Sequence, residues 1–254
     1  MKLHKPVVGG PCWTELGTSD MAQAERFYAE LFGWRCETDP RQEAGGYTVA
    51  HLGDAAVAAL TPLYQEGQPV AWTVSFAVRD ADETAQQVTA SGGTVVMNPM
   101  DVFDMGRFAV AADPSGAVFS LWQPRAFEGA GVFNAPGALG WVELLTREPA
   151  RARDFYTNVF GWTVNASEHY TQWGLAGQDF GGMMVMDDKF PHEVPPHWLP
   201  YFAVDDVDTA AATATGAGGT ALMEPTSVPE GPRIAVLRDP QGAVFGVYLA
   251  SDEG

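Results

Sequence analysis

The chain carries little positive charge. Its 14 lysines and arginines stand against 32 aspartates and glutamates, which gives its 254 residues a formal net charge of −18. Phosphate backbones and anionic membrane surfaces both attract basic side chains. The sequence therefore argues against nucleic acid and against a membrane surface as partners. We expect most of the acidic side chains to form a solvated surface.

Long apolar segments and cysteines are also scarce. No apolar run approaches the roughly 18 residues of a membrane span, and residues 1–11 lack the apolar segment of a secretory signal. Cys12 and Cys36 are the only cysteines, too few for a disulfide scaffold, and two reduced thiols are favoured over a bridge. The sequence contains no Walker-type phosphate loop and no motif centred on a nucleophilic serine. These absences predict a cytoplasmic protein, and a hydrophobic fraction of 46% predicts a globular one.

An internal repeat is the strongest positive signal. Residues 13–34 read WTELGTSDMAQAERFYAELFGW and residues 141–162 read WVELLTREPARARDFYTNVFGW, with 11 of 22 positions identical. Residues 72–94 resemble residues 198–220 in the same way, and both copies continue to a D-P-x-G-A-V-F sequence. The repeat predicts a tandem duplication. We place the domains at 1–124 and 138–254, joined by a linker at 125–137.

Each half contains the same pattern twice. Residues 13–18 alternate as a strand does, Asp20 is a suitable helix N-cap, and apolar residues then recur at helical spacing until Gly33. Three short strand patterns follow, and the order strand, helix, three strands starts again at Trp72. The predicted fold class is α+β, with four βαβββ units.

Four such units with F-Y-x-x-x-F-G-W after the first helix and D-P-x-G before the last strand resemble the vicinal oxygen chelate (VOC) superfamily. This is the glyoxalase, bleomycin resistance protein and dioxygenase fold. In detail the chain is similar to tandem two-domain, glyoxalase-like proteins of actinobacteria. The resemblance implies two glyoxalase-like domains whose mixed sheets curl into cups, with a metal or a substrate inside each cup.

The resemblance also locates the metal ligands of the family, and the residues found there are unsuitable. The equivalent positions are Trp13 and Trp141, Ala59 and Met184, Thr73 and Leu199, and Ser120 and Gly246. Divalent cations need several nitrogen, oxygen or sulfur donors. We therefore expect no metal in the family position and no cofactor. Glyoxalase I and extradiol dioxygenase activities are disfavoured, because both need that metal.

The cups should instead be aromatic. Side chains alternate along a strand, so Trp13 shares a face with Glu15, and Trp141 shares one with Glu143. A flat, largely apolar ligand would suit such a cavity. The predicted ligand-binding residues are Trp13, Trp141, Trp122, Ser120, His51, Leu199, Tyr201 and Tyr248.

Each of these residues also has a purely structural interpretation. The tryptophans could fill two cores, and His51 could be an ordinary core or surface histidine. Glu15 and Glu143 could make a structural hydrogen bond, for instance to Arg107 or Arg233, because carboxylates are rarely buried without a partner. Alternatively, their pKa is raised in an apolar cup and they exchange a proton with a substrate.

Three functions follow in order of preference. The first is a metal-independent protein that binds an aromatic or polycyclic small molecule, for antibiotic sequestration, self-resistance or an accessory role in biosynthesis. The second is an isomerase, cyclase or lyase of secondary metabolism that uses Glu143 or Glu15 as acid and base. The third is an interaction protein whose cups are filled cores. Four units in one chain suffice for a monomer, and a homodimer stays open.

Overall fold

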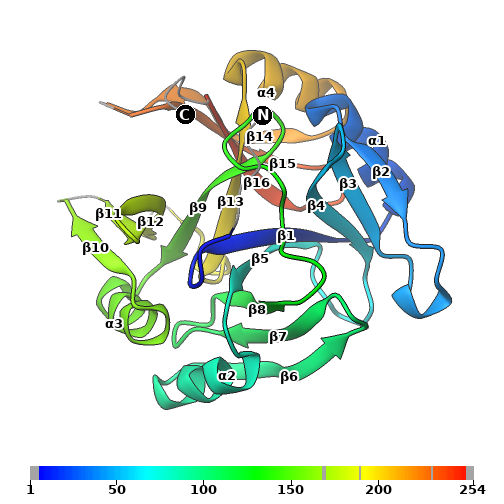
Figure 1. The fold of residues 1–254 in the computed structure, drawn as a ribbon. Helices are drawn as coiled ribbons and strands as arrows, with labels where there is room; N and C mark the ends of the chain where they lie inside the picture. The colour runs from blue at the N-terminus through cyan, green and yellow to red at the C-terminus, as the bar shows by residue number, and fades with distance from the viewer. Residues whose placement is uncertain (1–5, 168–169, 189, 230, 250–254) are drawn as a thin grey trace.

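Two eight-stranded mixed sheets, one from each half of the chain, form the framework (Figure 1). The structure is a computed structural model and describes residues 6–167, 170–188, 190–229 and 231–249. The strand orders are β2-β3-β4-β1-β5-β8-β7-β6 and β10-β11-β12-β9-β13-β16-β15-β14. The two orders are identical once the numbering is shifted by eight, so the sequence repeat is also a structural repeat.

In the first half, two βαβββ units join through the antiparallel pair β1 and β5, which places Glu15 opposite Thr73. Within the units, β1 pairs with β4 and β5 pairs with β8, both in parallel. The elements are β1 (Pro11–Thr18), α1 (Met21–Phe32), β2 (Arg35–Thr38), β3 (Thr48–Leu52), β4 (Ala55–Pro62), β5 (Ala71–Ala77), α2 (Ala81–Ala90), β6 (Thr94–Val102), β7 (Gly106–Ala112) and β8 (Val118–Pro124).

The second half repeats this arrangement, with Glu143 on β9 opposite Leu199 on β13. Its elements are β9 (Leu139–Thr146), α3 (Pro149–Phe160), β10 (Thr163–Ala166), β11 (Thr171–Leu175), β12 (Gln178–Val185), β13 (His197–Val204), α4 (Val207–Gly216), β14 (Thr220–Ser227), β15 (Arg233–Arg238) and β16 (Val244–Leu249). The α+β class and the four βαβββ units predicted from the sequence are confirmed.

The helix boundaries follow from local chemistry. The Asp20 side chain accepts a hydrogen bond from the Gln23 backbone N–H at 2.9 Å, which satisfies one free donor at the start of α1. Gly33 ends the helix in a left-handed conformation with φ 71°, which a glycine adopts without steric cost. Gly161 ends α3 in the same way. No helix in the described ranges is long and apolar enough to span a membrane.

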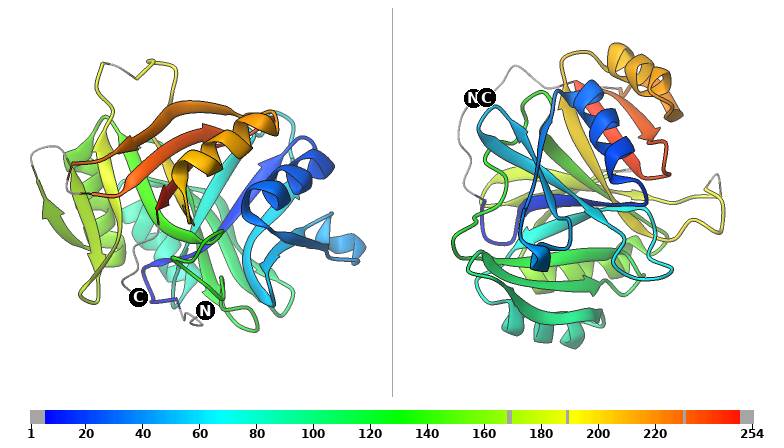
Figure 2. Two further views of the ribbon diagram at one scale, coloured as in Figure 1. Left: turned by 90° about the horizontal axis from the view of Figure 1, so that it is seen from above. Right: turned by 90° about the vertical axis from the view of Figure 1, so that its right-hand side faces the viewer.

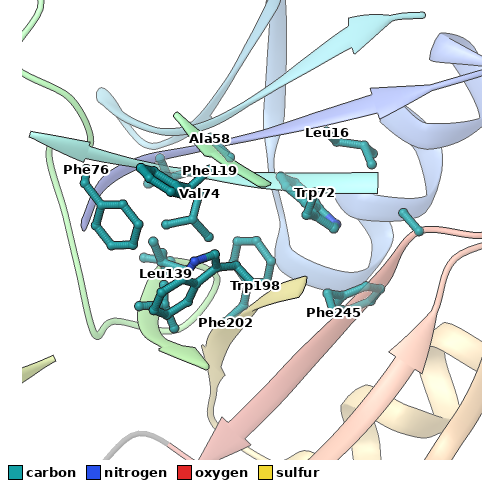
Figure 3. Close-up of a cluster of buried hydrophobic side chains, with 14 of the residues drawn as sticks. Leu16, Ala58, Trp72, Val74, Phe76, Phe119, Leu139, Trp198, Phe202 and Phe245 are labelled. Carbon is teal, nitrogen blue, oxygen red and sulfur yellow. The ribbon is translucent and has the colours of Figure 1, made fainter. Parts of the chain in front are cut away.

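A single apolar core lies between the two sheets and takes side chains from both halves (Figure 3). Phe76 on β5 packs against Trp198 on β13, with ring centroids 5.3 Å apart, and Trp72 packs against Phe202 at 5.2 Å. The helices meet across the same boundary, α1 against α4 and α2 against α3 (Figures 1 and 2). The two halves therefore share one hydrophobic core.

Crossed hydrogen bonds connect the repeated motifs inside this core. The Tyr28 hydroxyl of the first F-Y motif donates to Asp239 of the second D-P-x-G turn at 3.0 Å, and Tyr156 donates to Asp113 of the first turn at 3.1 Å. Asp239 Oδ1 also accepts the backbone N–H groups of Gln241, Gly242 and Ala243. The repeated motifs thus connect the two halves to each other.

Candidate functional site

The outer, concave face of the first sheet carries a second apolar cluster, which we call the N-terminal cup. Successive strand residues point to opposite faces, so Leu16 and Phe76 enter the shared core while Trp13 and Ala77 enter the cup. Trp13 is 4% exposed and Trp122 is 8% exposed. The buried members of the N-terminal cup are Cys12, Trp13, Ala59, Ala77, Trp122 and Ala130.

A chain of hydrogen bonds joins Trp13, Tyr47 and Glu15 in this cup. The Trp13 indole N–H donates to the Tyr47 hydroxyl at 2.9 Å, and Tyr47 in turn hydrogen-bonds to the Glu15 carboxylate. Burial raises the pKa of Glu15 above its ordinary value, and hydrogen bonds from Tyr47 and Trp13 offset part of the rise. Burial and the nearby Glu15 charge raise the pKa of Tyr47 well above its usual range. Burial therefore opposes ionisation of both the Glu15 carboxyl group and the Tyr47 phenol.

Two further polar groups face the same cup. Phe119 and Leu121 enter the shared core, so Ser120 between them points to the cup, and its side chain is 0% exposed. His51 pairs directly with Ala56, a cup residue, across the register shift that separates Ala50 from His51, and so faces the same side. Neither Ser120 Oγ nor His51 Nδ1 has a hydrogen-bond partner within the described residues. Buried polar atoms are normally paired, so both need an explanation.

Residues 125–137, between β8 and β9, cover the N-terminal cup. The Phe127 ring packs edge-on against Trp13 with centroids 4.9 Å apart, and its backbone oxygen accepts the Trp122 indole N–H at 2.9 Å. The backbone N–H groups of Ala130 and Gly131 donate to Cys12 and Ala56, each at 2.8 Å. This connecting segment thus lies directly over the cup.

The concave face of the second sheet carries an equivalent cluster, the C-terminal cup. Its buried members include Leu199 and Tyr201, which are 3% and 5% exposed, and half-buried Trp141 and Tyr248 pack against them. Its four buried residues are Leu145, Met186, Leu199 and Tyr201.

Glu143 is 7% exposed in this cup and has two tyrosine partners. The Tyr201 hydroxyl donates to Glu143 Oε2 at 3.2 Å, and Tyr170 also bonds to the carboxylate. The Trp141 indole N–H donates to Tyr170 at 3.0 Å, which repeats the Trp13–Tyr47 pair. Burial raises the pKa of Glu143, and the tyrosine hydrogen bonds offset part of the rise.

Three tyrosine side chains of the C-terminal cup lie against glycines. A Cβ atom built on Gly246 would overlap the Tyr201 ring, one on Gly182 would overlap Tyr170, and one on Gly140 would overlap the Tyr248 hydroxyl group. Each glycine makes room for a ring. The C-terminal cup is therefore filled by its own aromatic side chains.

The structure brings most of the predicted site residues together within their cups. Trp13, Glu15, Ser120, His51 and Trp122 lie on the face of the first cup. Trp141, Glu143, Leu199, Tyr201 and Tyr248 lie on the face of the second. The two groups line opposite sheets, so the prediction describes two separate sites.

Sequence reasoning missed Tyr47 and Tyr170, which hold the two carboxylates. Both precede a threonine that begins the third strand of the unit, so the repeat itself contains the signal. The loops before them differ in length, which hides the equivalence.

Two sequence-based expectations are wrong. Arg107 pairs with Asp82 and Asp101, and Arg233 pairs with Asp208, so neither arginine serves Glu15 or Glu143. In the second half, the residue equivalent to Ala59 is Gly182 rather than Met184, because Glu15 pairs with Ala59 and Glu143 pairs with Gly182.

The family's metal does not fit either cup. The four equivalent positions offer only the hydroxyls of Thr73 and Ser120 in the first cup and no ligating side chain in the second, because the indole nitrogens of Trp13 and Trp141 have no free lone pair. Across the residues with described positions, no three His, Cys, Asp or Glu side chains are placed to hold a metal ion. Hydroxyls and indoles alone do not make a divalent site.

Comparisons with known proteins agree with this fold. The chain is 41% identical over 248 residues to a protein of Mycobacterium tuberculosis (strain CDC 1551 / Oshkosh) provisionally named glyoxylase CFP32, covering 94% of each chain. It is 39% identical over 257 residues to the anthracycline biosynthesis protein DnrV of Streptomyces peucetius, covering 94% of this chain and 92% of DnrV. The anthracycline biosynthesis protein DauV of Streptomyces sp. (strain C5) is 38% identical over 268 residues, with the same two coverages.

Solved structures share the fold at low sequence identity. The 2,3-dioxygenase LapB from Pseudomonas sp. KL28 superposes with a TM-score of 0.69 at 14% identity, covering 97% of this chain and 93% of LapB. The Mn(II)-bound glyoxalase from Novosphingobium aromaticivorans gives 0.69 at 16% identity, covering 96% of this chain and 82% of that protein. The family profile matches residues 11–121 and again residues 138–247. The chain therefore belongs to the Glyoxalase/Bleomycin resistance protein/Dioxygenase superfamily.

Proposed function

We propose that this protein is a metal-independent member of the superfamily that binds a flat aromatic or polycyclic small molecule in a cup. One observation carries the proposal: each cup combines indole and phenol rings with one carboxyl group, buried at Glu143 and half-buried at Glu15, and the family ligand positions hold no set of metal donors. Aromatic walls with a few polar groups suit stacking on a planar ligand. The names of DnrV and DauV support a role in the biosynthesis of such molecules, or in their sequestration.

The side chains of both cups are closely packed, and their central residues are buried. One surface hollow lies beside α3 at Arg153, and a second lies at the margin of the N-terminal cup, where Ala77 and Glu128 line it together with Pro6 and Pro124. Because the cup side chains are buried against one another, a ligand must displace some of them when it enters, so we expect binding by induced fit.

Tryptophan fluorescence tests the proposal. Titration with a panel of polycyclic aromatics, including 1,4-dihydroxyanthraquinone, should quench emission and saturate, while free N-acetyl-tryptophanamide should give only linear collisional quenching. If no compound of the panel gave saturable quenching, the proposal would be contradicted. Metal analysis of protein purified without chelators should find no stoichiometric zinc, nickel, iron or manganese, and one equivalent per cup would contradict metal independence.

A second candidate is an isomerase, cyclase or lyase that transfers protons through Glu143 or Glu15. The raised pKa of both carboxyl groups favours it, because a carboxyl group that titrates closer to neutrality can both give and accept a proton. Glu143→Gln should then abolish turnover while ligand affinity stays within about twofold. Unchanged turnover in that variant would remove Glu143 from the mechanism.

A further inference from the structure

We infer that the N-terminal cup alone is the ligand chamber, and that Ser120 and His51 are the polar anchors that select a neutral planar aromatic molecule with a hydroxyl or carbonyl oxygen at its edge. This inference rests on the proposed function and deepens it. It names the working cup, the residues that determine specificity and the chemistry they recognise.

Equivalent positions in the two cups differ in a consistent way. Where the second cup has Tyr201 packed over Gly246, the first has Ser75 opposite Ser120. Both serines are buried, at 2% and 0% exposed, yet their side chains are far smaller than a tyrosine ring. In the second cup the rings of Tyr201 and Tyr248, which belong to the sheet itself, fill the space over two glycines, and Phe190 from the loop before β13 packs against the same cluster. The first cup is completed by Phe127 from the connecting segment.

A side-chain ring on a connecting segment is easier to displace than a ring on a central strand. Phe127 packs edge-on against Trp13 and also contacts Trp122 at 6.0 Å between centroids. An aromatic ligand that replaced Phe127 would find the same two indoles. Tyr201, by contrast, lies on β13, which is bonded on both sides to β9 and β16.

Two of the four buried polar atoms that lack a partner within the described residues also lie in the first cup; the other two are Trp173 Nε1 in the shared core and Gln241 Oε1 beside Gln23. Ser120 Oγ and His51 Nδ1 both lack a partner among the described residues, while in the second cup Glu143 is bonded by two tyrosines. A buried hydroxyl without a partner is disfavoured in the free protein, so a ligand oxygen that bonds to it gains the full interaction. Ser120 can donate to a carbonyl or accept from a hydroxyl.

The register places the two anchors on opposite sides of Trp13. Ser120 pairs with Ser75, which pairs with Trp13, and His51 lies on β3, two strands beyond Trp13 on the other side. Neighbouring strands are about 4.8 Å apart, so each anchor lies about two strand spacings, roughly 10 Å, from Trp13 along the sheet. A planar molecule stacked on Trp13 can thus extend a polar edge towards either anchor.

Charge restricts the ligand further. The N-terminal cup places the Glu15 carboxyl group among apolar side chains. A carboxylate or phosphate on the ligand would lie near Glu15 and would face a chain with a net charge of −18. Neutral phenols and quinones fit these conditions.

The experiment compares two probes, 1,4-dihydroxyanthraquinone and its oxygen-free parent anthracene, on the full chain by fluorescence titration. Ser120→Ala should weaken dihydroxyanthraquinone binding roughly five- to tenfold, the equivalent of one hydrogen bond, and leave anthracene unchanged. His51→Phe should give the same selective loss. Because Ser120 Oγ has no partner, Ser120→Ala should keep the wild-type melting temperature, which separates a binding role from a folding role.

Two loop phenylalanines provide a matched pair. Phe127→Ala should tighten binding of both probes several-fold, because the ring that occupies the chamber is gone. Phe190→Ala, which removes a ring packed in the C-terminal cup, should change neither affinity. If the wild type binds but Ser120→Ala and Phe127→Ala leave the affinities unchanged, or Phe190→Ala changes them instead, this inference is overturned while the proposed function stands. If the wild type binds neither these probes nor the rest of the panel, the proposed function itself fails.

Discussion

The two halves of the chain are alike where they face each other, and the differences that matter for a ligand lie on the faces that point outward. Trp72 and Trp198, Tyr28 and Tyr156, and Asp113 and Asp239 are repeated without change, and all six lie in or beside the shared core. The cups share a tryptophan, a tyrosine and a glutamate but differ at the adjoining positions, with Ser75 and Ser120 in one and Tyr201 and Gly246 in the other. Selection for packing thus acts on the common interior, while the cups are free to specialise.

The largest expected effect comes from the common interior. Asp239→Ala removes the acceptor of Tyr28 and of three backbone N–H groups, so it should lower the free energy of unfolding by about 3 kcal/mol. Asp113→Ala, at the equivalent position, should cost a similar amount. Urea denaturation measures both. A loss below about 1 kcal/mol in either variant alone would show that the two equivalent aspartates do not stabilise the fold equally.

A smaller effect should separate the cups at one equivalent position. Gly246→Ala drives a methyl group into the Tyr201 ring and should cost about 1–3 kcal/mol, as overpacking does. Ser120→Ala, the matched change to the same residue type, should cost less than about 0.5 kcal/mol, because no partner is lost. Equal costs, measured by thermal or urea unfolding, would mean that the two cups are packed alike.

The smallest effect depends on pH. Glu143 has a raised pKa in the folded protein, so the folded state holds a proton that the unfolded state releases. Its contribution is complete below the ordinary glutamate pKa and is lost as pH rises through the folded pKa. Each pKa unit of elevation corresponds to about 1.4 kcal/mol. Glu143→Gln should therefore flatten the decline in stability between acidic and neutral pH.

Glu15→Gln provides the comparison, because Glu15 also has a raised pKa but hydrogen-bonds to one tyrosine rather than two. Denaturation at several pH values should show the same direction of change in both variants. A steeper decline after either substitution would contradict the burial effect.

Local signals in the sequence were enough to predict the architecture. The Asp20 cap, the Gly33 stop and the repeated D-P-x-G turns each act through neighbouring residues, so the pattern of four units could be predicted. Strand alternation also put Trp13 beside Glu15 on one face. The partners of those carboxylates could not be predicted, because Tyr47 and Tyr170 follow loops of unequal length.

The contacts between halves were beyond local reasoning for another reason. Tyr28 and Asp239 are 211 residues apart, and nothing in either motif indicates that its partner lies in the other copy. The prediction that arginines pair with Glu15 and Glu143 was wrong for a similar reason. Arg107 on β7 and Arg233 on β15 instead form ion pairs with Asp82 and Asp208, which lie in the helices α2 and α4.

The crossed tyrosine–aspartate bonds also bear on how a duplicated chain arises. In a chain that contained one half only, the same bonds would join two molecules, and folding would depend on protein concentration. Joining the copies through residues 125–137 makes the association intramolecular, with an effective concentration on the order of millimolar for a short linker. The fused gene would also escape the symmetry of a homodimer, in which a mutation alters both cups at once. Duplication therefore made independent change of the two cups possible.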